Sequence, residues 1–187
     1  MDDAQFIVWL RNQDYVKGRV GDSAATVASQ RAWLETYFTR KGDYYFLVET
    51  LGRVPVGTYG IYGVRGDSGE SGRWIIRPGV PAALPSGIVL VDVAFNHLSL
   101  RELHGSTVAT NQTVLSINRK FGFRQIGSQH AAQIIGGEPV DLVNFSMTAD
   151  EWPKARERLM PLARLAEAQV LDWERENIQT PVSFAVK

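Results

Sequence analysis

One stretch of the chain, residues 106–127, constrains the fold more than any other because it predicts a strand, a helix and a second strand in close succession. Its front is rich in β-branched side chains, which favour a strand. Asn111 then lies where a helix N-cap belongs, since its side-chain oxygen can accept a hydrogen bond from the first turn. Helical spacing continues to Phe121, and Gly122 can end the helix in the left-handed conformation. This stretch therefore predicts a compact strand-helix-strand unit.

The overall charge balance argues against an electrostatic binder. The chain has 187 residues, with 20 Lys and Arg against 20 Asp and Glu, so its formal net charge is zero. No global field attracts it to nucleic acid or to anionic lipid, and neither partner is expected. This length fits one domain with a substantial core.

Cysteine and histidine usage excludes several kinds of site. The sequence has no cysteine, which excludes disulfides, thiolate nucleophiles and cysteine-ligated zinc. Its three histidines, His97, His104 and His130, have no close pairing, so no metal site is expected. No apolar run reaches the roughly 18 residues that span a bilayer, and the Met-Asp-Asp start lacks the basic residues of a signal peptide. We expect a cytoplasmic protein without a membrane partner.

Hydrophobic periodicity predicts helices near both ends and several antiparallel strands between them. Helices are expected around residues 6–10, 26–38 and 88–98, and from residue 151 onward; strands are expected at 44–49, 54–62, 73–77, 103–110, 124–135 and 140–147. The glycine-rich residues 66–72 predict a flexible loop.

Residues 78–87 are the least regular part of the sequence. They contain three prolines, which forbid a regular helix or a central strand through the segment. Ser86 is expected to cap the apolar helix that follows.

The last part of the chain predicts an amphipathic helix. Pro153 fits the first turn of a helix, and Pro161 is expected to break or restart it. One expected face carries Leu162, Leu165, Ala166, Gln169, Val170 and Trp173. Such a stripe must be buried either on its own domain or on a second chain, which leaves a homodimer as an alternative.

The spacing of four residues in the central stretch resembles the last motif of the GCN5-related N-acetyltransferase (GNAT) superfamily. In that motif an Asn opens a helix that ends in Lys-x-Gly-Phe, here Asn111, Lys120, Gly122 and Phe123. The resemblance implies an α+β fold: a mixed, mostly antiparallel sheet with a splayed parallel strand pair, flanked by helices. We expect residues 1–150 to form this domain without its usual first strand, and residues 151–187 to form a C-terminal helical extension.

The resemblance also implies acetyl-CoA, or another acyl-CoA, as the cofactor, bound where strands 73–77 and 103–110 diverge. Its pyrophosphate would lie on amides at the start of the following helix. The usual glycine-rich loop is only loosely echoed in residues 77–83, where proline removes amides. The implied cofactor-binding residues are Ile75, Ile76, Arg77, Gly79, Ser86, Gly87, Asn111, Asn118 and Lys120.

A narrower resemblance concerns the acceptor. Residues 30–34 and 74–79 look like segments of the branch that acetylates amino groups of nucleotide-linked sugars for surface polysaccharides. The ribosomal-protein N-terminal acetyltransferase branch shares some of these features, so a protein or peptide amine remains an alternative. A non-catalytic binding or dimerisation domain is the rival from another class. The implied substrate-binding residues are Arg11, Asn12, Tyr45, Tyr59 and Trp74.

Acetyl transfer to an amine requires a proton acceptor and a donor for the leaving thiolate. Glu49, His104 and Asp92 are candidates for the acceptor, although His104 and Asp92 also fit structural roles. Asn118 stands where the family often places a tyrosine donor, and an Asn donates a hydrogen bond but supplies no proton. Ser116 or a water is then the alternative acid.

Overall fold

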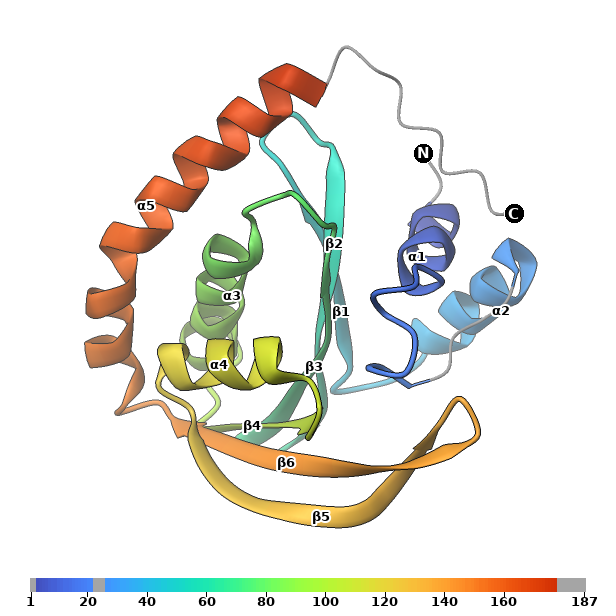
Figure 1. Cartoon of the computed structure of the whole chain (residues 1–187). Helices are drawn as coiled ribbons and strands as arrows, with labels where there is room; N and C mark the ends of the chain where they lie inside the picture. The colour runs from blue at the N-terminus through green and yellow to red at the C-terminus, as the bar shows by residue number, and fades with distance from the viewer. Residues whose placement is uncertain (1–2, 22–25, 178–187) are drawn as a thin grey trace.

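The chain forms one mixed six-stranded sheet with helices on both faces (Figure 1). The computed structural model describes residues 3–21 and 26–177. The sheet order is β1-β2-β3-β4-β6-β5, and every neighbouring pair is antiparallel except β3 with β4. The strands are β1 (Tyr44–Glu49), β2 (Pro55–Arg65), β3 (Ser68–Ile76), β4 (Glu102–Val108), β5 (Arg124–Ile135) and β6 (Glu138–Thr148). The helices are α1 (Asp3–Arg11), α2 (Val27–Tyr37), α3 (Ala83–Asp92), the π-helical turn η1 (Val93–His97), α4 (Gln112–Phe121) and α5 (Trp152–Asn177).

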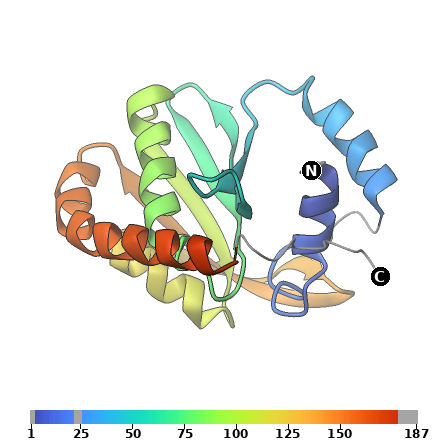
Figure 2. The ribbon, with the colours of Figure 1, turned by 90° about the horizontal axis from the view of Figure 1, so that it is seen from above.

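The two faces of the sheet carry different helices. Helices α3, α4 and α5 cover one face, while α1 and α2 lie on the other, as the two perpendicular views show (Figures 1 and 2). The larger core lies under α3, α4 and α5 and includes Ile61, Leu103 and Phe145. A smaller core joins α1 to the sheet through Phe6 and Ile75.

The parallel pair β3 and β4 splays apart, as the resemblance implied, and the expected fold class is confirmed. The two strands pair only from Ser68 with Glu102 to Ser71 with Gly105. Beyond that point β3 stays with β2 and β4 stays with β6. The β2–β3 register shifts opposite Tyr59, and Arg73 there has a φ of +54°, which marks a bulge in β3. This bulge lies on the strand that leaves the pair.

The central strand-helix-strand unit also forms as predicted. The Asn111 Oδ1 atom accepts a hydrogen bond from the Val114 amide at 3.4 Å and so caps α4. Gly122 ends α4 with a φ of +97°, and the Phe123 amide donates to the Asn118 carbonyl. Both contacts join residues that are close in the sequence. The local sequence pattern was therefore sufficient to predict them.

Two local predictions were wrong. Residues 66–72 form a tight turn and the start of β3 rather than a flexible loop, because pairing with β2 and β4 orders this segment. Ser86 does not cap α3, which begins at Ala83. The Ser86 hydroxyl instead donates to the Ala82 carbonyl at 2.6 Å within its own helix, and no side chain caps the start.

The C-terminal helix also departs from its prediction. Pro161 lies inside α5 without breaking it. Leu162 and Leu165, expected in the buried stripe, are 56% and 65% exposed, whereas Trp152, Ala155, Leu159 and Ala163 are buried in the main core. The buried face begins at Trp152, well before Leu162, because the helix binds α3 from its first residue. Val170 and Trp173 of the predicted stripe do pack on the domain, against the cluster of Val56, Val80 and Ala82.

Polar contacts fix both ends of α5 to the same chain. Near its start, Asp92 at the end of α3 accepts hydrogen bonds from Trp152 Nε1 at 2.7 Å and Arg156 Nε at 2.9 Å. Near its other end, the buried Glu174 carboxylate accepts hydrogen bonds from the Thr50 hydroxyl and the Gly52 amide at the β1–β2 turn. None of the helices described is both long enough and apolar enough to cross a membrane.

Candidate functional site

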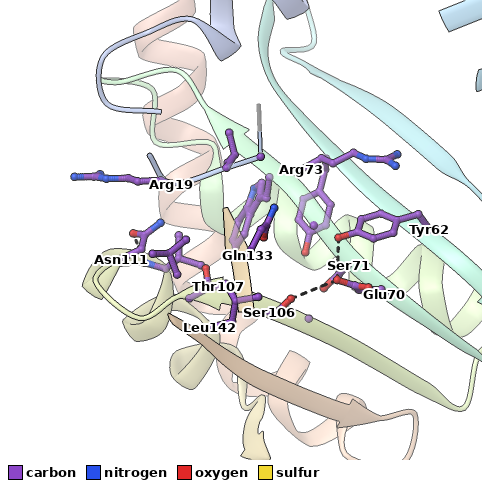
Figure 3. A pocket seen from close by; sticks show the side chains of 18 of the residues that line it. Arg19, Tyr62, Glu70, Ser71, Arg73, Ser106, Thr107, Asn111, Gln133 and Leu142 are labelled. Carbon is purple, nitrogen blue, oxygen red and sulfur yellow. Dashed lines mark hydrogen bonds between the residues drawn. The ribbon is translucent and has the colours of Figure 1, made fainter. Parts of the chain in front are cut away.

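A cleft of about 420 Å³ opens where β3 and β4 diverge (Figure 3). Its lining comes from α1, the segment after α1, α2, strands β1 to β6 and α4. The cleft therefore draws on elements from both faces of the sheet, and the splay connects them.

Glu70 provides the carboxylate of this cleft. It lies on β3 in the last part of the parallel pairing, next to Ser71. The Tyr62 hydroxyl donates to Glu70 Oε1 at 3.0 Å, and the Ser106 hydroxyl approaches the same oxygen at 3.5 Å (Figure 3). Burial, and then the Glu70 charge, raise the pKa of Tyr62, so this phenol stays a neutral donor. The second carboxylate oxygen, Oε2, has no hydrogen bond to a protein group among those resolved in the described residues.

A second charged group in the cleft, Arg73, is already neutralised. Its Nη1 and Nη2 atoms donate to the two Asp43 oxygens at 2.6 and 3.1 Å. Its guanidinium also lies near the rings of Trp33, Tyr45 and Tyr62, at 4.5 to 5.7 Å from their centroids. Burial opposes the charge of Arg73, but the Asp43 carboxylate outweighs it and the pKa of Arg73 is raised.

Two further arginines line the cleft from the α1 side. The Arg11 Nη2 atom donates to the Gly21 carbonyl at 2.8 Å, which ties α1 to the segment after it. Arg19 lies on that segment with its guanidinium at the opposite side of the view from Glu70 (Figure 3). Gln133 reaches this side from the β5–β6 hairpin and lies close to Gly21. Neither Arg11 nor Arg19 pairs with a carboxylate among the described residues.

The opposite half of the cleft is built from backbone and aromatic groups. Asn111, Val114 and Asn118 line it from α4, and Tyr59 and Trp74 line it from the sheet. The Trp74 Nε1 atom is buried without a hydrogen-bond partner. Past Ser71 and Gly105 the facing edges of β3 and β4 are not paired with each other, so their main-chain groups remain open to a ligand.

Comparison with known families identifies this arrangement. The acetyltransferase (GNAT) domain matches residues 1–124, about two thirds of the chain. The chain belongs to the GNAT family. It is therefore an acetyltransferase, and its substrates are amines. No curated protein matches the sequence significantly.

Solved GNAT structures share the fold at low sequence identity. A GCN5-related N-acetyltransferase from Brucella melitensis superposes with a TM-score of 0.72 and 19% identity, over 86% of this chain and 76% of that one. A variant of the spermidine N-acetyltransferase SpeG from Vibrio cholerae gives a TM-score of 0.70 and 17% identity, over 80% of this chain and 90% of that one. At these identities the likeness shows the fold alone.

The cofactor of GNAT enzymes, acetyl-CoA, fits the backbone of this chain. The unpaired strand edges can bind the pantetheine amides, and the buried Trp74 Nε1 lacks a protein partner in the same half. The start of α3 has no side-chain cap, so the Ala83 and Leu84 amides remain available to an anion such as the pyrophosphate. Pro81 and Pro85 have no amide N–H and offer no donor in this segment.

The cleft brings together six of the sites predicted from sequence: Arg11, Tyr45, Tyr59, Trp74, Asn111 and Asn118. Other predicted residues lie outside its lining. Ile75 packs under α1, Ile76 packs toward α5, and Gly87 is buried against Phe121. Asn12 donates to the Val8 carbonyl. Arg77, Gly79, Ser86, Ser116 and Lys120 also lie outside the lining.

The three residues considered as proton acceptors do not line the cleft either. Glu49 pairs with Arg53 and lines a second, more apolar hollow between β1, α3 and α5. The His104 Nε2 atom lies 3.5 Å from Glu102 Oε2, and Asp92 binds α5. The prediction missed Glu70 because it assigned residues 66–72 to a loop. If residues 54–76 had been treated as one β2–β3 hairpin, Glu70 would have been placed opposite Tyr62 as a cross-strand pair.

Proposed function

We propose that this GNAT enzyme transfers the acetyl group of acetyl-CoA to a small primary amine, with Glu70 as the group that binds the amine and takes its proton. The proposal rests on the position of Glu70 in the cleft, where β3 and β4 begin to diverge; we call this point the vertex of the splay. When bound, acetyl-CoA supplies the activated acetyl thioester. The remaining requirements fall on the residues of this chain.

The acceptor nitrogen must lose a proton before it can attack, because an alkyl ammonium has a pKa of about 10. Glu70 can bind the ammonium through its free oxygen and accept a proton directly or through one water. Tyr62 and Ser106 hold the other oxygen and so fix the orientation of the carboxylate. Asn118 lines the half of the cleft that α4, Tyr59 and Trp74 form, which we call the cofactor half. Its side-chain amide can donate a hydrogen bond to the departing sulfur there.

The acceptor that we favour is an amino sugar on a nucleotide carrier. Trp33 and Tyr45 line the other half of the cleft, which also contains Glu70 and the two arginines and which we call the acceptor half. Their aromatic rings offer faces on which a sugar or a base can pack. A protein N-terminal amine remains the alternative acceptor. Both the nucleotide sugar and a cytoplasmic location stay predictions.

The test compares binding and turnover in the wild type and in Glu70→Gln. Calorimetry with acetyl-CoA should show the same affinity for both proteins, because Glu70 lies on the acceptor side of the splay. Release of free thiol with an amine acceptor should fall by about 100- to 10,000-fold in Glu70→Gln, as expected for loss of a general base. Glu157→Gln, an exposed change on α5, is the matched control.

Two outcomes would contradict the proposal. If the wild type gives no heat with acetyl-CoA, the chain is a GNAT fold that does not use this cofactor. If acetyl-CoA binds and Glu70→Gln turns over like the control, another group takes the proton. Glu49→Gln, tested alongside, would then show whether the residue predicted from sequence does so.

A further inference from the structure

The charges of the acceptor half are distributed unevenly along the cleft. Glu70 lies at the vertex of the splay, and Arg11 and Arg19 line the α1 side. In Figure 3 the Arg19 guanidinium and Glu70 lie at opposite sides of the view. A ligand that spans the cleft therefore meets a negative carboxylate at one end and positive guanidinium groups at the other.

Arg73 does not change this balance. Its charge is matched by both Asp43 oxygens, and its donors toward them are used. The rings of Trp33, Tyr45 and Tyr62 lie around its guanidinium. An ammonium group of a ligand in contact with these rings would therefore lie beside a cation, whereas an uncharged sugar or base can still pack on them.

The two arginines of the α1 side favour a ligand group that accepts hydrogen bonds. An arginine has five N–H donors and no acceptor, so it binds oxyanions and repels ammonium groups. Arg11 uses one of these donors on the Gly21 carbonyl and is thereby held at the cleft. Arg19 has no carboxylate partner among the described residues. Helix α1 and the segment after it lie on the face of the sheet opposite α3 (Figure 1), so we expect both arginines to meet the acceptor rather than the phosphates of the cofactor.

We infer that the acceptor carries an oxyanion, a phosphate or a carboxylate, in addition to its amine, and that Arg19 and Arg11 bind that group while Glu70 binds the amine. This inference rests on the proposed function and narrows its substrate class. A polyamine such as spermidine, which has cationic groups at both ends, is a poor fit because one end would face the two arginines.

The experiment measures kcat/KM with acetyl-CoA and matched amino sugars. Glucosamine has no anion, glucosamine 6-phosphate has a phosphate and muramic acid has a carboxylate, so the set separates the two sources of the oxyanion. Spermidine is the cationic comparison. The wild type should prefer at least one anionic sugar over glucosamine by about 10- to 100-fold, the range for hydrogen bonds to charged groups. Arg19→Glu should abolish or reverse that preference.

Arg65→Glu is the matched control, since Arg65 is an exposed arginine at the end of β2, outside the cleft. Its preference should equal that of the wild type. A second readout does not need turnover: binding of glucosamine 6-phosphate and muramic acid, measured by calorimetry with CoA present, should weaken at least tenfold in Arg19→Glu for the preferred sugar.

The possible failures are distinguishable. Equal use of all the sugars, or an unchanged preference in Arg19→Glu, would overturn the inference and leave the acetyltransferase proposal intact. A preference for spermidine would also overturn it. If acetyl-CoA does not bind, the proposed function fails, and equal binding of the anionic sugars to the wild type and Arg19→Glu would overturn the inference as well.

Discussion

The two halves of the cleft are built in different ways. The cofactor half offers the diverging main-chain edges of β3 and β4, beside Asn111, Asn118 and Trp74. The acceptor half consists of side chains from distant parts of the sequence, among them Arg19, Glu70 and Gln133. Main-chain donors and acceptors are present whatever the side chains are, so a half built from them survives a loss of sequence pattern.

This difference explains why the loss of the usual glycine-rich pattern in the proline-rich segment does not mean that the fold lacks a cofactor half. Residues 77–83 keep little of the usual glycine-rich pattern, yet the chain still forms the splay and a free helix start. In the acceptor half, by contrast, we propose that a single side chain, Glu70, takes the proton. We therefore expect substitutions in the acceptor half to change acceptor use and those in the cofactor half to change acetyl-CoA affinity.

Three tests probe this comparison between the halves: two substitutions and a pH titration. Asp43→Asn should change the free energy of unfolding the most. It removes the counter-charge of Arg73, which would remain half-buried among three aromatic rings. Loss of hydrogen bonds to a charged group predicts a fall of about 1.5–3 kcal/mol in the free energy of unfolding, measured by urea denaturation. Acetyl-CoA affinity should change little.

The control for this prediction is Asp67→Asn. Asp67 lies 3.7 Å from Arg101 in a pair whose side chains are both well exposed, so its loss should change stability by about 0–1 kcal/mol. Equal effects of the two substitutions would mean that the Asp43–Arg73 pair does not stabilise the acceptor half.

Asn111→Ala probes the cofactor half with a smaller effect. The change removes the cap of α4 and should lower the free energy of unfolding by about 1 kcal/mol. Thr26→Ala, which removes the cap of α2 away from the cofactor half, should cost a similar amount. Only Asn111→Ala should also weaken acetyl-CoA binding in calorimetry. Unchanged stability and affinity in Asn111→Ala would refute both roles.

A pH titration should give the smallest effect, at the hairpin that closes the acceptor half. The Asp141 carboxylate accepts a hydrogen bond from the Ala131 amide at 2.8 Å, and His130 Nδ1 lies 2.8 Å from the same oxygen. The Ala131 amide, together with His130, lowers the pKa of Asp141 below its ordinary 3.8. A lowered carboxyl pKa stabilises the fold above the ordinary value, and this contribution is lost as the pH falls through the lowered one.

The Ala131 amide resonance should therefore move in NMR with a midpoint below pH 3.8. The same resonance should not show this transition in Asp141→Asn. A midpoint above 3.8 would show that the hydrogen bond does not favour the charged form.

Sequence reasoning reached the fold and part of the site. It predicted the splay and the capped α4, and it placed Tyr45, Tyr59 and Trp74 in the cleft. It failed where long-range pairing overrode a local signal. The glycines in residues 66–72 indicated a loop, yet strand pairing on both sides makes most of this segment part of β3 and brings Glu70 to the vertex.

The C-terminal helix shows the same limit of local sequence signals. Its apolar residues predicted an amphipathic helix, but the periodicity could not say which residues would meet α3. Its rotation is fixed by long-range contacts at both ends. Trp152 and Arg156 donate to Asp92 of α3 at one end, and Glu174 accepts from Thr50 at the β1–β2 turn at the other. Leu162 and Leu165 consequently face outward.

The sequence by itself determined the elements whose hydrogen bonds join residues a few positions apart: the Asn111 cap, the Gly122 end of α4 and the Thr26 capping box of α2. The tertiary structure alone decided the pairs that join distant residues, such as Asp43 with Arg73 and Glu70 with Ser106. Local contacts depend on backbone geometry that neighbouring residues impose. Distant pairs depend on strand register and on how the helices pack, and only the folded chain fixes these.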